Sequence, residues 1–179
     1  MTDIERRNLI ATLNLEYGAT YRYLLQAQRF LSPRAVALIE GVRRNEADHI
    51  AFMLNLLEND ITEAPEGFKT LYLHLKLNLA FEQEAVKFYG QFSREAEDPA
   101  IRDTFRTLLK SEAGHVRLFE EMIKALEEGS FPRIFLCPLC GWEINYGPGA
   151  GAGAVQKCEK CGARFELILE NGDFALKAA

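Results

Sequence analysis

Two Glu-x-x-His motifs stand out in the sequence, Glu46 with His49 and Glu112 with His115. Residues three apart on a helix lie on the same face, so each motif would present a carboxylate and an imidazole one turn apart. Mixed carboxylate and imidazole ligands suit iron or manganese. A single motif of this kind arises easily by chance, whereas two copies in similar surroundings predict a metal site.

An internal repeat connects these motifs to two further glutamates. Glu16 and Glu82 each lie 30 residues before the glutamate of one motif. Both begin the same pattern, Glu-x-x-Ala-x-x-x-Tyr, which ends at Tyr23 and at Tyr89. The sequence therefore predicts two copies of one helical hairpin, each with three candidate ligands.

Four long helices must position these ligands. Leu, Ala, Glu, Arg and Phe dominate the first part of the chain and predict helices at about 3–30, 33–58, 68–97 and 99–128. Ser32 and Asp98 each precede a proline, which marks a helix start. Apolar residues recur every three or four positions, and the candidate ligands lie on these apolar faces near each helix centre. Carboxylates in a bundle core are costly unless they bind metal, so two divalent cations are expected.

A glutamate from each of two helices and a Glu-x-x-His from each of two others is the ligand arrangement of di-iron and di-manganese bundles. The predicted ligands are Glu16, Glu46, His49, Glu82, Glu112 and His115. We expect Glu46 and Glu112 to bridge the metals. Glu16 and Glu82 would be terminal ligands, and each histidine would bind one metal.

Three other residues are predicted to lie near this site. Glu84 is the alternative to Glu82, but it lies off the apolar face and its counterpart in the first hairpin is Gly18. Tyr23 and Tyr89 lie two turns from a ligand on the same face. They are either core aromatics or hydrogen-bond partners of a ligand carboxylate or a bound oxygen species.

The four cysteines form two C-x-x-C pairs, Cys137 with Cys140 and Cys158 with Cys161. Paired cysteines at such spacing predict a tetrahedral thiolate site, which holds either iron or zinc. A glycine follows each pair and allows the turn a positive φ. Between the pairs, the glycine-rich stretch 147–154 predicts a flexible connector.

The chain resembles the rubrerythrin family, in which a ferritin-like di-iron bundle precedes a rubredoxin-like Fe(Cys)₄ domain. The residues that carry the resemblance are Glu16-x-x-Ala19-x-x-Arg22-Tyr23, Glu46-x-x-His49, Glu82 with Tyr89, Glu112-x-x-His115, and the paired C-x-x-C with Phe165-Glu166-Leu167. We expect a mainly α chain with a ferritin-like four-helix bundle at 1–130. A small rubredoxin-like or zinc-ribbon β module would follow at 131–179.

The resemblance implies a peroxidase that acts in oxidative-stress defence. Two iron ions in the bundle would reduce hydrogen peroxide, or dioxygen as the alternative oxidant, to water. One iron in the cysteine site would relay electrons from an external reductase. The resemblance also implies a homodimer in which the relay iron of one subunit lies close to the bundle site of the other.

The sequence departs from the family in two places. Many rubrerythrins carry a second glutamate three residues after the ligand of the third helix, where this chain has Ala85. The spacer between the cysteine pairs is also longer than the family leads us to expect. These departures favour an alternative function, a ferroxidase or iron-handling protein with a structural zinc-ribbon tail.

The connection between the second and third helices limits how one chain can build the bundle. A 28-residue helix is about 40 Å long. The connection at about 59–67 spans at most ~30 Å. Exchange of hairpins between two chains of the dimer is therefore one expectation.

Charge and hydropathy exclude some partners. The net charge is −5 and no basic block offsets it, so nucleic acid is not an expected partner. No apolar run approaches the ~20 residues that span a bilayer. The N-terminal residues lack the basic and apolar regions of a secretory signal, so we expect a cytoplasmic protein without a membrane partner.

Overall fold

The computed structural model describes residues 1–179. The elements in chain order are α1 (Asp3–Ala27), α2 (Pro33–Asp60), α3 (Lys69–Glu95), α4 (Pro99–Glu127), β1 (Ile134–Leu136), β2 (Glu143–Asn145), β3 (Val155–Lys157), β4 (Arg164–Glu170) and β5 (Asp173–Ala178). Four helices followed by small antiparallel strands confirm the predicted fold class. The chain divides into two compact units, Met1–Thr62 and Glu63–Ala179, which are described separately.

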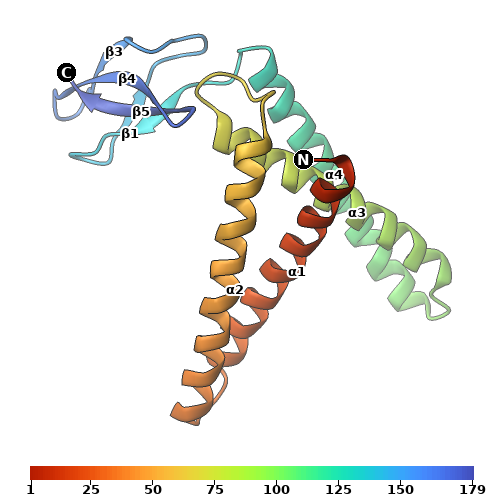
Figure 1. The fold of residues 1–179 in the computed structure, drawn as a ribbon. Helices are drawn as coiled ribbons and strands as arrows, with labels where there is room; N and C mark the ends of the chain where they lie inside the picture. Colours follow the sequence, from red (N-terminus) through yellow and green to blue (C-terminus); the bar gives the residue numbers. More distant parts are fainter. The chain divides into compact units, whose positions relative to one another are not determined.

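The first unit is a hairpin of α1 and α2, drawn in red and orange in Figure 1. Thr2 and Glu5 form a capping box at the start of α1, and the Ser32 side chain caps α2 one residue before Pro33. Helix α1 ends at Ala27, three residues earlier than predicted. At the open end of the hairpin, the Arg6 guanidinium donates to the Asp60 carboxylate at 2.6 Å.

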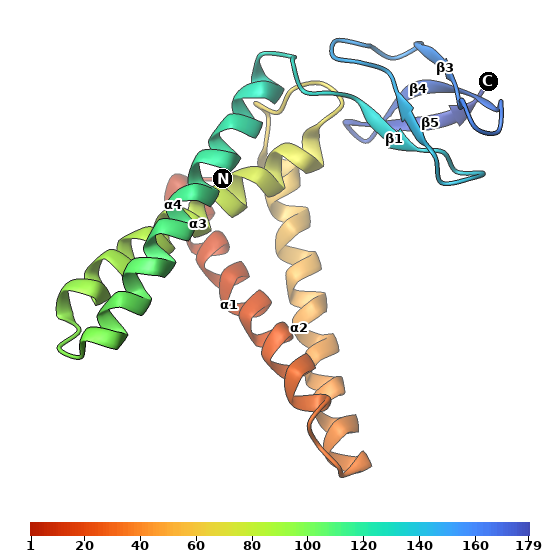
Figure 2. The same ribbon diagram turned by 180° about the vertical axis from the view of Figure 1, so that it is seen from behind.

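The second unit begins with a hairpin of α3 and α4, which lie side by side in both views (Figures 1 and 2). The Asp98 side chain caps α4 by accepting from the N–H groups of Ala100 and Ile101. At the open end, the Tyr72 hydroxyl donates to the Glu127 carboxylate at 2.8 Å. The two hairpins thus have the same arrangement of helices. Different side-chain contacts join the two helices at the end away from the loop.

The strands form two small antiparallel sheets in a cysteine module, which we define as residues 131–179. One sheet pairs β1 with β2, and the other has the order β3-β4-β5. The buried residues of the whole cysteine module are Cys137, Ile144, Tyr146, Cys158, Phe165, Leu167 and Phe174. The glycine-rich connector is part of this fold, because Gly153 N–H donates to the Leu167 carbonyl and Leu167 N–H donates to the Ala154 carbonyl, both at 2.8 Å.

The cysteine module packs on the start of α3. The Phe68 ring meets the rings of Phe131 and Phe174 edge to face, each at 5.7 Å between centroids. The Arg133 guanidinium lies 5.3 Å from the Phe68 centroid and 5.0 Å from that of Phe174. The module therefore forms one compact unit with the second hairpin. The division predicted from the sequence, at about residue 130, remains a prediction.

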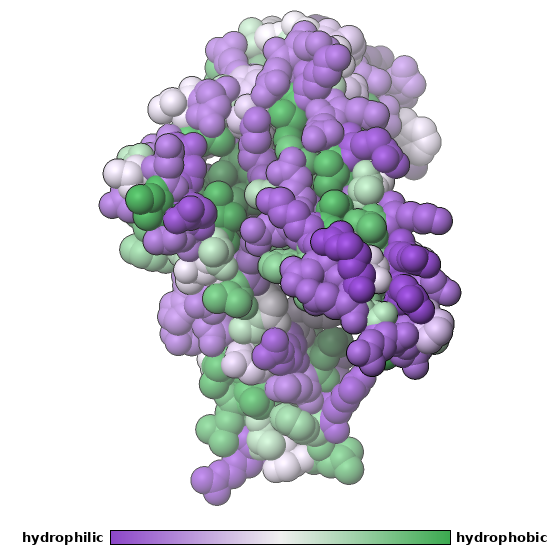
Figure 3. Space-filling view, turned by 90° about the vertical axis from the view of Figure 1, so that its right-hand side faces the viewer, coloured by the Kyte–Doolittle hydropathy of each residue, from purple (hydrophilic) through white to green (hydrophobic).

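Both hairpins leave large apolar side chains exposed at equivalent positions of the repeat. Leu15 of α1 is 74% exposed and Phe81 of α3 is 52% exposed. Phe52 of α2 and Leu118 of α4 are 65% and 51% exposed. Figure 3 shows apolar surface, in green, open to solvent on the face that it draws. None of the helices is both long enough and apolar enough to cross a membrane.

Candidate metal centres

The first hairpin brings Glu16, Glu46 and His49 together as a first triad. The Nδ1 atom of His49 lies 3.0 Å from Glu46 Oε2 and 3.4 Å from Glu16 Oε1. The two carboxylates are about four-fifths covered, whereas the imidazole is half exposed. Helix α1 thus contributes one ligand and α2 contributes two.

The second hairpin repeats this geometry as a second triad, formed by Glu82, Glu112 and His115. The Nδ1 atom of His115 lies 2.7 Å from Glu112 Oε2 and 3.4 Å from Glu82 Oε1. The side-chain exposures also repeat, at 48% for the histidine and 14% and 17% for the glutamates. Helix α3 contributes one ligand, as α1 does, and α4 contributes two, as α2 does.

These distances suit a shared cation. Metal–ligand bonds to nitrogen and carboxylate oxygen are about 2.1 Å, so two ligands at a right angle lie about 3.0 Å apart. The histidine–carboxylate separations in the two triads run from 2.7 to 3.4 Å. In each triad, three ligand atoms therefore lie close enough together to bind the same metal ion.

The chemistry of Glu82 supports the same conclusion. Its Oε2 atom is buried and has no hydrogen-bond partner. Burial raises the pKa of Glu82 above its usual range, the neighbouring Glu112 carboxylate adds to the rise, and His115 opposes it. An unpartnered buried carboxylate oxygen is costly in the protein alone, and a bound cation would remove that cost. The residues present thus fit a metal ion.

The other residues predicted to lie near the triads are Glu84, Tyr23 and Tyr89. Glu84 is exposed and lies outside both triads. The Tyr89 ring stacks on Phe105 at 6.2 Å between centroids, as a core aromatic would. Hydrogen bonding by the Tyr23 and Tyr89 hydroxyls to a ligand or oxygen species remains a prediction.

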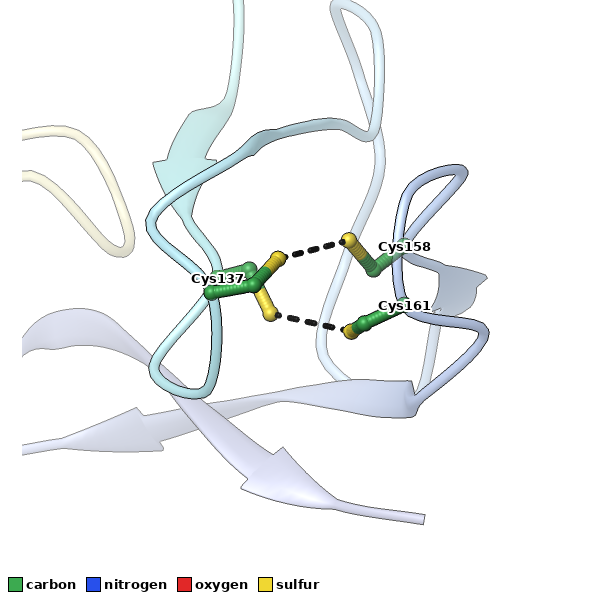
Figure 4. A group of neighbouring side chains, drawn as sticks. Cys137, Cys158 and Cys161 are labelled. Carbon is green, nitrogen blue, oxygen red and sulfur yellow. Dashed lines mark hydrogen bonds between the residues drawn. The ribbon is translucent and has the colours of Figure 1, made fainter.

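All four cysteines lie together in the cysteine module as free thiols. Figure 4 labels three of them, Cys137, Cys158 and Cys161. The sulfur atoms of Cys137 and Cys161 are 3.7 Å apart, and those of Cys140 and Cys158 are 3.6 Å apart. A tetrahedral site with metal–sulfur bonds of about 2.3 Å places its sulfurs about 3.8 Å apart. The cluster therefore has the spacing of a mononuclear tetrathiolate site.

The two C-x-x-C turns are built alike. Gly141 N–H donates to the Cys137 carbonyl at 2.8 Å, and Gly162 N–H donates to the Cys158 carbonyl at 2.9 Å. These glycines have φ values of 71° and 80°, which confirms the predicted need for glycine there. The turns fix the four sulfurs without help from a disulfide.

The thiols compete for protons in this cluster. Backbone N–H donation from Cys161, opposed by burial and reinforced by Lys160 N–H, lowers the pKa of Cys158 to about 7. Hydrogen bonding from the Trp142 N–H lowers the pKa of Cys140. Burial and the other thiols have the larger, opposite effect and raise that pKa to about 12. Cys158 thus ionises more readily than Cys140 near neutral pH, and metal binding requires thiolates.

Comparison with known proteins bears on the second hairpin. The rubrerythrin family model matches residues 74–133, which include α4, nearly all of α3 and the second triad. Over these residues, about a third of the chain, the resemblance to rubrerythrins is confirmed. No curated protein matches the chain.

The rubrerythrin match agrees with the geometry of the second triad. Rubrerythrins are di-iron proteins, so the match supports iron-binding triads and an oxidoreductase in general. The first triad lies outside the matched residues but has the same ligands and nearly the same distances. The four-cysteine cluster agrees with the rubredoxin-like half of the resemblance.

Proposed function

We propose that this chain is a non-haem di-iron oxidoreductase that reduces hydrogen peroxide to water in oxidative-stress defence. The observation that carries the proposal is the presence of two matching Glu-Glu-His triads and a four-cysteine cluster in one chain. Two ferrous ions would supply the two electrons that, with two protons, convert one peroxide molecule into two water molecules. An iron in the cysteine cluster would return electrons from an external reductase.

The two triads would combine into one dinuclear site. Each triad supplies only three ligands, and four carboxylates from two triads balance two divalent cations. In the combined site Glu46 and Glu112 would bridge, while Glu16 and Glu82 would be terminal. His49 and His115 would bind one metal each. The apolar side chains exposed beside both triads give the hairpins surface to bury against each other.

We propose that the protein is a cytoplasmic homodimer with exchanged hairpins. Helix α2 has 28 residues and is about 42 Å long, but only residues 61–68 connect it to α3. Fully extended, this connection spans about 28 Å. In an exchanged dimer, the first hairpin of one chain would meet the second hairpin of the other, and no connection would run the length of a bundle.

Complementation between two variants tests the exchange. Glu46→Ala breaks the first triad, and Glu112→Ala breaks the second, so neither homodimer has an intact site. In an exchanged heterodimer of the two, the unmodified triads meet and restore one dinuclear site. Without exchange, every site keeps one broken triad. Co-expressed variants that bind no bundle iron would rule out the exchanged dimer.

Stopped-flow oxidation tests the choice of oxidant. The fully reduced protein is mixed separately with hydrogen peroxide and with dioxygen, and oxidation of the bundle iron is followed by absorbance. Peroxide should oxidise the bundle iron faster than dioxygen does. Much faster oxidation by dioxygen would overturn the peroxidase assignment.

A ferroxidase is the second candidate, favoured by Ala85. Without a carboxylate three residues after Glu82, the two triads are symmetric in their ligands. The colour of the cysteine site separates the candidates: an Fe(Cys)₄ centre is red and has visible charge-transfer bands, whereas zinc is colourless. A colourless cysteine site beside an iron-loaded bundle would favour the ferroxidase.

A further inference from the structure

Thr20 differs from the other threonines that lie beyond the first turn of a helix. Thr12, Thr104 and Thr107 are exposed, and each donates its hydroxyl to the carbonyl four residues earlier, at 2.8–2.9 Å. The Thr20 hydroxyl is buried and has no hydrogen-bond partner. A buried hydroxyl without a partner costs free energy, and back-bonding to Glu16 would relieve that cost at this position.

The position of Thr20 relates it to the first triad. It lies four residues after Glu16 on α1, so the two side chains share one face of the helix. The equivalent position of the second hairpin, four residues after Glu82, is Val86. The triads have matching ligands, but only the first has a hydroxyl four residues after the glutamate of its first helix.

We propose that the Thr20 hydroxyl is a hydrogen-bond donor to the small oxygen species or anion that enters the dinuclear site. The inference rests on the proposed function, because it requires the first triad to hold metal. In the structure the hydroxyl donates neither to a backbone carbonyl nor to Glu16, so it remains available to a ligand from outside the protein. Thr20 makes an otherwise symmetric site unequal on its two sides.

Azide binding to the oxidised, iron-loaded protein tests this role without relying on turnover. Thr20→Val removes the hydroxyl and copies the residue found in the second hairpin. Hydrogen bonds to charged groups contribute about 1.5–3 kcal/mol, so azide affinity should fall about tenfold to a hundredfold. Thr20→Ser should restore most of the affinity. Thr12→Val, which removes an exposed, back-bonded hydroxyl, should leave it unchanged.

Stability of the metal-free protein separates this role from a structural one. Because the hydroxyl has no protein partner, Thr20→Val should unfold at the same temperature as the wild type or higher. A clear loss of stability would show that the hydroxyl has a protein partner and would overturn the assignment.

Metal content distinguishes failure of this inference from failure of the proposed function. A wild-type protein whose triads hold no iron would overturn both. Full iron content in Thr20→Val with unchanged azide affinity would overturn only the role of Thr20.

Discussion

The Asp173 carboxylate accepts a hydrogen bond from the backbone N–H of Thr70 at 2.9 Å and another from the Thr70 hydroxyl at 2.6 Å. Phe68, the N-cap residue of α3, makes no side-chain capping hydrogen bond. The first residue of β5 therefore caps α3 from 103 residues away. This contact couples the cysteine module to the helix that carries Glu82.

Asp173→Ala should destabilise the protein, because it leaves the first turn of α3 without its capping acceptor. The loss of a helix cap lowers the free energy of unfolding by about 1–2 kcal/mol, measurable by urea denaturation. Asp103→Ala is the matched control, since the Asp103 side chain forms only an exposed surface pair with Arg106. Equal effects of the two substitutions would show that the cap is unimportant.

Gly67→Ala should disturb the contact between the cysteine module and the start of α3. Gly67 has a φ of 83°, and a Cβ atom there would collide with the Phe174 ring. We expect a loss of more than about 1 kcal/mol in unfolding free energy. Gly41→Ala, in an open part of α2, should instead stabilise the protein by about 0.5–1 kcal/mol. A neutral effect at Gly67 would contradict the packing of Phe174 against it.

Joint substitution of Glu46 and Glu112 by Ala should remove both bundle metals, because each triad loses a carboxylate ligand. Metal analysis of the purified protein should then find only the ion of the cysteine site. Glu84→Ala removes an exposed carboxylate outside the triads and should leave the metal content unchanged. Bundle iron at full stoichiometry in the double variant would refute the ligand set.

Removal of metal should expose a pH dependence that originates at Glu82. Burial raises the pKa of this carboxyl, so the folded state holds its proton more tightly than the unfolded chain. The resulting destabilisation is present above the raised folded-state pKa and disappears as the pH falls to the ordinary value.

Glu82→Gln tests this dependence in the metal-free protein. The variant should be more stable than the wild type at neutral pH, and the difference should shrink as the pH falls through the Glu82 pKa. The readout is the urea midpoint at a series of pH values. Glu84→Gln, which removes a nearby exposed charge, provides the control. A difference that is constant with pH would rule out Glu82 as the source.

The sequence alone was sufficient to predict which candidate ligands lie together. Helical periodicity and the 30-residue repeat selected Glu82 over Glu84, and the structure places Glu82 in the second triad and Glu84 outside both. The cysteine spacing likewise predicted a four-thiol cluster, which the structure confirms. Both groupings could be predicted because helix geometry and short turns depend on neighbours a few residues away.

Only the tertiary structure revealed the cap from Asp173, the burial of the Thr20 hydroxyl and the contacts of the glycine-rich connector. The glycine-rich stretch predicted a flexible connector, but both the backbone N–H and the carbonyl of Leu167 in β4 form hydrogen bonds with it. Thr20 and Thr12 look alike in the sequence, since both lie in α1 with a carbonyl one turn earlier. Which hydroxyl is exposed and back-bonded, and which is buried without a partner, depends on packing among residues distant in the chain.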